Sequence, residues 1–244
     1  MRNLSPFAAF LLLLLPASAS RAAEPLKIHL ISGSGEYKSE ESLKEFSKYL
    51  EKTYFVQVTA SWARDGAAEL EDLEPLAEAD LLLVFARRLK LGEEQMKQIR
   101  AHWEAGKPVL GIRTAGHAFG QADNELFDRR VLGGNYQGHF GNEPVKVENA
   151  AEQAQHPVLA GVGPFTSGKL YKAGELAEDT VVLQTGDIGK ARHPVTIVHE
   201  YKGGRMFFTS LGVPSDFQDN NFRRLLTNAL FWTAGRDAAE MRRE

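Results

Sequence analysis

A short apolar strand that ends in basic side chains is the first place in this sequence where residue types and spacing could do chemistry. Residues 108–112 read Pro-Val-Leu-Gly-Ile, and Arg113-Thr-Ala-Gly-His117 follows directly. In open α/β sheets, ligands bind beyond the carboxyl ends of the strands. Several hydrolase folds place a nucleophile on a sharp turn at this position, but this turn carries neither Ser nor Cys. We therefore expect a site at this turn, with Arg113 and His117 as its candidate catalytic side chains.

A second histidine, His139, ends a segment rich in glycine and aromatic residues. Residues 132–139 read Leu-Gly-Gly-Asn-Tyr-Gln-Gly-His, which we interpret as a shaped loop at the same edge of the sheet. A histidine near Arg113 would be disfavoured as a cation and could act as a neutral base. His139 is therefore the candidate acid/base, and Arg113 would hold a developing oxyanion or a substrate carbonyl. The alternatives stay open: His117 could cap a turn, and Arg113 could be the buried partner of an Asp or Glu.

The turn after the first predicted strand supplies hydroxyl groups. Residues 32–35 read Ser-Gly-Ser-Gly, which suggests a phosphate cradle, but Lys38 stands where a dinucleotide-binding fingerprint has its third glycine. We therefore expect this turn to let a substrate approach the backbone, with Ser32 and Ser34 as hydrogen-bonding groups. Tyr171 and Asp216 are the other side chains that we expect to bind substrate hydroxyls.

Metal and cofactor chemistry has weak support in the sequence. His117, His139 and Asp216 could meet in space around a divalent metal, but no His-x-Glu-x-His or His-Glu-x-x-His spacing is present. No metal ligand and no cofactor is therefore predicted. Two of the remaining histidines have simpler interpretations. His29 lies inside the first strand and is structural, and His102 lies on a helix surface.

The composition excludes several classes of protein. The 244 residues include no cysteine, which rules out thiol nucleophiles, thiolate metal ligands and disulfides. The net charge of −3, from 29 basic and 32 acidic side chains, gives no electrostatic case for a nucleic-acid partner. Beyond the first residues, no run is long and apolar enough to cross a membrane.

The first 22 residues have the pattern of a secretory signal peptide. A weakly basic start precedes an almost wholly apolar run at residues 7–15, and Ala17-Ser18-Ala19 follows as a small-residue cleavage signal. We expect cleavage after Ala19 or Ala22, and hence an exported protein, periplasmic or secreted. About 220 residues remain, which fits one domain over residues 25–236 with a short tail at 237–244.

Apolar runs and amphipathic stretches alternate along the rest of the chain. Strands are predicted at residues 26–31, 55–60, 80–85 and 108–112. Between them we expect a helix that Ser39 caps and a helix that Gly92 opens. This order is typical of an α/β, doubly wound, mostly parallel, flavodoxin-like sheet. Further short strands are predicted at residues 145–148, 181–184, 195–199 and 205–209. We interpret the last two as an antiparallel hairpin that extends one edge of the sheet, before a closing helix capped by Asp219 or Asn220.

Four motifs, in order along the chain, resemble those of the ThuA-like (trehalose utilisation) family, which has the class I glutamine amidotransferase-like fold. They are residues 108–115, residues 132–139, His156-Pro157-Val158 with Leu170-Tyr171, and residues 193–212 with the closing Phe231-Trp-Thr-Ala-Gly235. Three positions depart from the family pattern: Arg113 replaces a histidine, Val213 follows Leu-Gly where many relatives have His, and Gly168-Lys169 stands where Asp-Glu is common. Without cysteine, glutamine hydrolysis through a thioester is excluded.

The resemblance implies a role in sugar metabolism, on a carbohydrate or an oxidised keto-sugar. Three functions stay open from the residues. The chain could be a hydrolase, lyase or isomerase that acts on (keto-)glycosides. It could instead be a sugar-binding module that keeps the cleft without the chemistry, which the three departures favour. It could also be an interaction domain of the cell envelope, and the oligomeric state is open in each case.

Overall fold

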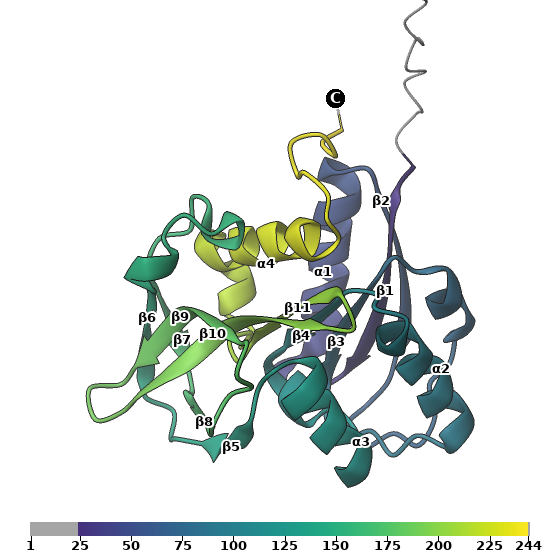
Figure 1. Cartoon of the computed structure of the whole chain (residues 1–244), viewed down its shortest axis with the longest axis horizontal. Coiled ribbons are helices and arrows are strands. Elements are labelled where there is room, and N and C mark those ends of the chain that lie inside the picture. Colours follow the sequence, from purple (N-terminus) through teal and green to yellow (C-terminus); the bar gives the residue numbers. More distant parts are fainter. Residues whose placement is uncertain (1–23, 244) are drawn as a thin grey trace, which may run out of the picture.

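The strands predicted first form the parallel half of a large sheet. The computed structural model describes residues 24–243, and within them nine strands form one sheet in the order β2-β1-β3-β4-β11-β10-β9-β6-β7 (Figure 1). The parallel strands are β1 (Leu26–Gly33), β2 (Val56–Trp62), β3 (Leu81–Ala86), β4 (Val109–Ile112) and β11 (Gly204–Thr209). The predicted signal peptide and the last residue of the tail lie outside the described residues.

The antiparallel half of the sheet begins at the last strand of the parallel half. β10 (Arg192–Tyr201), β9 (Val181–Asp187), β6 (Pro144–Asn149) and β7 (Phe165–Gly168) follow β11 in antiparallel pairs. The predicted hairpin of β10 and β11 is confirmed, but its predicted position at an edge is wrong. β11 pairs with β4 in the middle of the sheet, where its almost wholly buried side chains are covered on both faces.

Helices cover both faces of the sheet (Figure 1). α1 (Ser39–Thr53) and α4 (Asn220–Thr233) share one apolar core, to which they contribute Leu43, Phe46, Phe222 and Leu226. α2 (Glu93–Glu104) packs on the other face, followed along the chain by α3 (Gln121–Leu126) and a π-helical turn, η4 (Phe127–Val131). Among the described residues, no helix has both the length and the apolar character that a membrane span requires.

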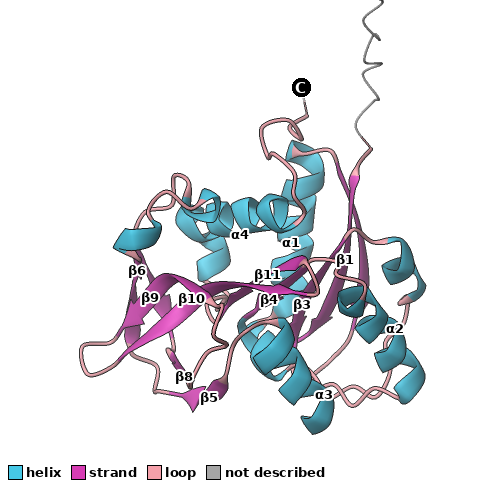
Figure 2. Ribbon diagram, in the orientation of Figure 1, coloured by secondary structure: helices cyan, strands magenta, loops and turns pink. Residues whose placement is uncertain are grey.

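Short elements complete the chain. β5 (Tyr136–His139) and β8 (Tyr171–Ala173) form a separate two-stranded sheet, which lies below β9 and β10 in the view of Figure 2. Short 3-10 turns connect the larger elements: η1 (Gly35–Tyr37), η2 (Glu74–Glu78), η3 (Arg113–His117), η5 (Ala151–Gln153), η6 (Pro157–Leu159) and η7 (Asp216–Gln218). The loop expected at residues 132–139 is therefore partly a strand.

Two local predictions about helix ends have different outcomes. The Asp219 carboxylate caps α4 as predicted, because Oδ1 accepts from the backbone N–H groups of Asn221 and Phe222. Ser39 does not cap α1: the preceding Lys38 is the capping residue, in a left-handed conformation. The Ser39 hydroxyl instead accepts from the Ser34 amide at 2.9 Å, so it closes the turn after β1.

The two histidines that were assigned no function are both buried. His29 is structural, as predicted: its ring nitrogens lie 2.9 Å from Thr59 Oγ1 and 3.2 Å from Ser61 Oγ on neighbouring β2. The surface position predicted for His102 is wrong. Its Nε2 lies 3.0 Å from the Pro108 carbonyl and fastens the end of α2 to the start of β4.

Candidate functional site

The carboxyl edge of the parallel strands brings the predicted residues into one region. The turn after β3 is bonded to the turn after β4, because the Arg88 amide donates to the His117 carbonyl at 2.9 Å and the Leu89 amide donates to Ala118 at 2.7 Å. Arg88 and Arg113 both adopt left-handed backbone conformations, with φ of 52° and 53°. Non-glycine residues in this region are uncommon and cluster at functional sites. The predicted turn therefore has the geometry expected of a site.

Arg113 lies inside the protein, with 0% of its surface exposed. Its Nη1 donates to the Ser210 carbonyl, and its Nη2 donates to the Lys169 carbonyl at 3.0 Å. The guanidinium carbon stacks between two rings, 4.5 Å from that of Tyr37 and 4.3 Å from that of Tyr171. Cation–π contacts of this kind are strongest where water is excluded. Arg113 therefore holds the turn, Tyr37 and Tyr171 together.

The alternative that left Arg113 paired with an acid has no support in the geometry. Among residues 24–243, Arg113 makes no ion pair with a carboxylate. Its charge is balanced by carbonyl dipoles and aromatic faces instead. In this conformation the guanidinium does not reach a cavity, so contact with a substrate carbonyl would require a movement of the tyrosines.

The predicted substrate-binding hydroxyls and carboxylate are also buried. The Ser32 hydroxyl lies 2.8 Å from Ser39 Oγ, and both belong to the turn after β1. Asp216 Oδ2 accepts from Ser167 Oγ at 2.7 Å and from the backbone amides of Gly212 and Val213. Burial raises the pKa of the Asp216 carboxyl, and this effect outweighs the three hydrogen bonds, which lower it. Both residues build the loops of the carboxyl edge.

Ser34 and Tyr171 are buried next to the same loops. The Ser34 hydroxyl is buried without a hydrogen-bond partner among the described residues. Burial is also the main reason that the pKa of the Tyr171 phenol is raised. Tyr171 remains in contact with the candidate site through its ring, which lies 4.8 Å from that of Tyr136.

A cavity of about 590 Å³ opens beside the turn after β4. It extends between that turn, the start of α3, the π turn η4 and β5, and among the described residues it is lined by Arg88, Lys90, His117, Phe119, Gly120, Gln121, Asn124, Glu125, Asp128, Arg129, Asn135, Tyr136 and Gln137. Ligand pockets for small molecules commonly have volumes of about 300–1,000 Å³. This cavity is therefore large enough for a sugar.

His117 lines this cavity in its neutral form. Its ring stacks on that of Tyr136 with 4.2 Å between centroids, and its Nδ1 is buried without a hydrogen-bond partner among the described residues. Burial, followed by the nearby charges of Arg88 and Arg87, lowers the pKa of His117 to about 3. The turn-capping alternative for His117 has no support, because the ring faces the cavity and Tyr136.

Asp128 lines the same cavity and was missed in the sequence. Its Oδ2 accepts from the Tyr136 amide at 2.7 Å, whereas its Oδ1 is buried without a partner among the described residues. Burial raises the pKa of Asp128 to about 7, against the hydrogen bond from Tyr136. The sequence contains only a weak signal for Asp128, an acid that lies between the apolar Phe127 and two arginines. Asp128 lies in the π turn η4, and π turns are frequent at functional sites.

His139 lies close to this region without facing the cavity. It pairs with Tyr171 across β5 and β8, and so lies on the same side of the molecule as Arg113. Its side chain is exposed, and its Nδ1 lies 2.6 Å from the Phe140 carbonyl. The described lining includes Tyr136 and Gln137 of β5 but not His139. The acid/base role predicted for His139 stays a prediction.

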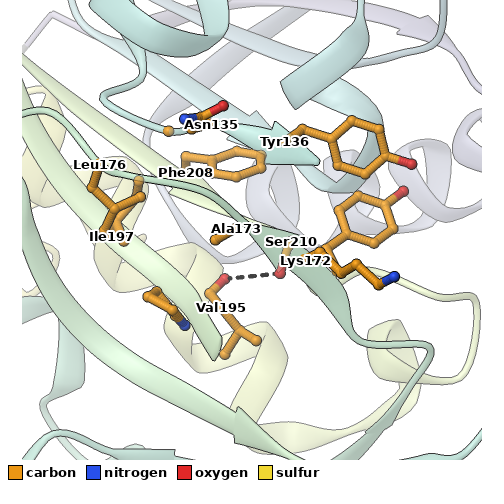
Figure 3. A pocket seen from close by; sticks show the side chains of 12 residues that line it. Asn135, Tyr136, Lys172, Ala173, Leu176, Val195, Ile197, Phe208 and Ser210 are labelled. Carbon is orange, nitrogen blue, oxygen red and sulfur yellow. Dashed lines mark hydrogen bonds between the residues drawn. The ribbon is translucent and has the colours of Figure 1, made fainter. Parts of the chain in front are cut away.

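A second, narrower pocket has Asn135, Tyr136 and Phe208 among its lining residues (Figure 3). The side chains of Leu176, Ile197 and Phe208 make it apolar, and the Ser210 hydroxyl beside it donates to the Val195 carbonyl at 3.5 Å. Its space of about 20 Å³ has room for about one water molecule. The narrow pocket therefore does not compete with the larger cavity as a sugar site.

No metal centre is formed by the candidate ligands. Within residues 24–243, no three His, Asp or Glu side chains are grouped so that they could hold a metal ion. His117, His139 and Asp216 are therefore not brought together as the sequence allowed.

Comparisons with known proteins agree with the fold. Residues 27–233 match the family ThuA, described as trehalose utilisation. A ThuA-like protein from Bacteroides uniformis superposes with a TM-score of 0.67 at 18% identity, over 91% of this chain and 97% of that one. A ThuA-like protein from Parabacteroides merdae superposes with a TM-score of 0.69 at 17% identity, over 87% of this chain and 91% of that one. A β-galactosidase from Rahnella sp. R3 superposes with a TM-score of 0.60 at 15% identity, over 88% of this chain but only 32% of that one. The curated proteins contain no match.

Proposed function

Since this chain belongs to the ThuA family, whose description is trehalose utilisation, we propose that it acts on a carbohydrate or keto-sugar in the cavity that His117 and Asp128 line. Membership of this family supports a function related to sugar metabolism. The cavity adds amide groups from Asn124 and Gln137 that can bond hydroxyls, and the Tyr136 ring as a flat apolar surface.

One observation carries the proposal. A histidine whose pKa is lowered to about 3 and a carboxyl whose pKa is raised to about 7 face the same cavity. Two titratable groups whose environments shift their pKa values in opposite directions are typical of acid–base sites. Below about pH 7, Asp128 keeps a proton that it can donate to a glycosidic or carbonyl oxygen. Neutral His117 can accept a proton from water or from a carbon beside a carbonyl.

Arg113 has a positioning role in this proposal. It touches neither cavity, but its cation–π contacts hold Tyr171, and Tyr171 packs against both Tyr136 and His117. This chain of rings fixes the stack in which His117 lies. The direct contacts with substrate that the sequence predicted for Arg113, Ser32, Ser34 and Asp216 stay predictions.

The second candidate is a sugar-binding module without catalysis. The lowered pKa that keeps His117 neutral also makes it a weak base, because a group with a pKa of about 3 holds a proton poorly at neutral pH. A cavity with hydrogen-bonding groups and a weak base fits binding as well as turnover. The departures from the family pattern at Arg113, Val213 and Gly168-Lys169 favour the same alternative.

A panel of plain and oxidised disaccharides, with trehalose among them, separates the two functions. We expect wild type to turn over an oxidised sugar, and we expect His117→Gln and Asp128→Asn each to lower the rate by about 100-fold, the size of a general acid–base contribution. His156→Gln is the matched control, because His156 packs against Trp232, outside the described lining of the cavity. Binding without turnover in wild type would establish the module, and absence of binding would overturn both candidates.

We also propose that the protein is exported. The support is the apolar run at residues 7–15 and the small residues up to Ala22. Expression of the full chain in a bacterium should give a mature protein outside the cytoplasm whose first residue is Ser20 or Ala23. An intact N-terminal Met in the recovered protein would contradict the proposal.

A further inference from the structure

The rim of the proposed sugar site carries unbalanced positive charge. Arg88 comes from the turn after β3, Lys90 lies two residues on, and Arg129 comes from the π turn. None of these three side chains makes an ion pair with another residue of the range 24–243. The acids that line the same cavity are Glu125, which is exposed, and Asp128, whose buried carboxyl favours the protonated form.

Neighbouring cations show that pairing is available at this edge of the sheet. Arg87 Nη1 lies 3.1 Å from Asp65 Oδ2, and Lys169 Nζ lies 3.1 Å from Glu36 Oε1. These two cations also belong to the carboxyl edge, but they are not among the described residues that line the cavity. Arg88, Lys90 and Arg129, which line the cavity, have no such acidic partner among the described residues.

The backbone fixes the position from which Arg88 reaches the cavity. Its amide donates to the His117 carbonyl, and its φ of 52° lies in the left-handed region, which non-glycine residues rarely adopt. The left-handed backbone therefore fixes where the exposed Arg88 side chain starts, in the lining of the cavity that His117 also lines. Arginine binds carboxylates and phosphates through two parallel hydrogen bonds, which makes it suited to an oxyanion with a fixed direction.

We propose that the sugar taken by this cavity is acidic, with a carboxylate or a phosphate held by Arg88. This inference rests on the proposed function, because it names the class of sugar that the same cavity selects. Lys90 and Arg129 add positive charge at the rim. Asn124 and Gln137 line the same cavity, and their amide nitrogens already donate to the Gly116 carbonyl and to Asn135 Oδ1.

An acidic substrate would also change His117. Arg88 is the nearby charge that contributes most to lowering the pKa of His117, after burial. An anion bound to Arg88 offsets that charge and makes the imidazole a stronger base when the substrate is in place. A neutral sugar in the same cavity would leave the imidazole as it is.

Binding measurements with three probes test the inference and separate the two anions. Glucuronate, glucose 6-phosphate and glucose are titrated into wild type, Arg88→Asn, Arg88→Lys and Arg236→Asn. Asparagine tolerates the left-handed backbone at position 88. Arg236 is the control, because it is an exposed arginine in a groove lined by the starts of β1 and β4, at the opposite edge of the sheet.

We expect wild type to bind glucuronate or glucose 6-phosphate at least tenfold more tightly than glucose, and whichever binds tighter identifies the anion. Arg88→Asn should remove that preference and leave the affinity for glucose unchanged, Arg88→Lys should keep part of it, and Arg236→Asn should keep all of it. The preference should fall as salt is raised, because the charges lie at a solvent-exposed rim.

The unfavourable outcomes are distinguishable. Equal affinity for glucose and for both acidic sugars would overturn this inference and leave the proposed function standing. Inorganic phosphate that binds as tightly as glucose 6-phosphate would also overturn it, because the rim would then be a simple anion site. If none of the three sugars binds, this inference fails, and the disaccharide panel decides separately whether the proposed function stands. Arg129→Gln repeats the test from another element if Arg88→Asn does not fold.

Discussion

Two arginines at the ends of neighbouring parallel strands have the same backbone conformation and opposite surroundings. Arg88 after β3 and Arg113 after β4 have φ of 52° and 53°. Arg88 is exposed at the mouth of the cavity, whereas Arg113 is completely buried between two tyrosine rings. The comparison shows that strain at the edge of a sheet does not by itself identify the residue that meets a ligand. Burial and hydrogen-bond partners decide which arginine is structural.

The buried arginine should give the largest effect. Arg113→Leu removes two charged donors and leaves the Ser210 and Lys169 carbonyls without them. Hydrogen bonds to a charged group contribute about 1.5–3 kcal/mol each, so we expect the free energy of unfolding to fall by about 3–5 kcal/mol. Urea denaturation followed by circular dichroism measures it. A loss below about 1 kcal/mol would show that Arg113 is not the anchor of the carboxyl edge.

The carboxyl in the cavity should give a smaller, pH-dependent effect. Because the pKa of Asp128 is raised to about 7 in the folded protein, the unfolded chain loses this proton first as pH rises from about 4 to 7, and wild type loses stability over that window. Asp128→Asn lacks this loss and keeps an oxygen for the Tyr136 amide. We expect the variant to gain about 2 kcal/mol or more on wild type between pH 4 and pH 8, at 1.36 kcal/mol per unit of pKa.

Thermal melts of both proteins at these two pH values measure the gain. A stability difference between Asp128→Asn and wild type that is the same at pH 4 and pH 8 would show that the carboxyl titrates normally. The cavity would then lack the protonated acid on which the proposed mechanism depends.

The ring and the hydroxyl of Tyr37 can be separated. Arg113 Nη2 donates to the Tyr37 hydroxyl in a long hydrogen bond of 3.4 Å, while the guanidinium carbon lies 4.5 Å from the centroid of the Tyr37 ring. Desolvated cation–π contacts reach about 2 kcal/mol, so Tyr37→Leu should lower the free energy of unfolding by about 1–2 kcal/mol. Tyr37→Phe keeps the ring and should lower it by less than about 1 kcal/mol. Equal losses in urea denaturation would assign the stabilisation to the hydroxyl.

The exposed arginine should give the smallest effect on stability. Arg88→Asn removes a side chain that has no ion-pair partner among residues 24–243. The asparagine that replaces it tolerates the left-handed backbone at this position. We expect the variant's free energy of unfolding, measured by urea denaturation, to match that of wild type within the ±0.5 kcal/mol usual for surface substitutions. A large destabilisation would remove the contrast with Arg113, since both arginines would then be structural.

The sequence predicts the parallel half of this fold well, for physical reasons. Residues 81–86 form a continuous apolar run, and a run of this kind is typical of a strand that is covered on both faces of the sheet. The strands and helices then alternate, and that order alone places the turns after β3 and β4 at one edge. The position of His117 at a cavity follows from this topology.

The parts that the sequence does not predict depend on contacts between distant segments. Arg113 is buried because Tyr37, 76 residues away, and Tyr171 enclose it. Asp128 joins the site because the Tyr136 amide reaches back to it from β5. His102 is buried because the chain turns at Gly106 and returns with Pro108 beside the ring. The local sequence around each of these residues does not predict its contacts with distant segments.

The central place of β11 constrains the order in which a nascent chain can assemble. β4, at residues 109–112, must wait for residues 204–209 before its second edge is covered, so nearly a hundred residues leave the ribosome in between. Until then the amino-terminal strands present an open apolar edge of the kind that recruits other chains. A chain that stops short of residue 204 is therefore left with two half-sheets and no strand to join them.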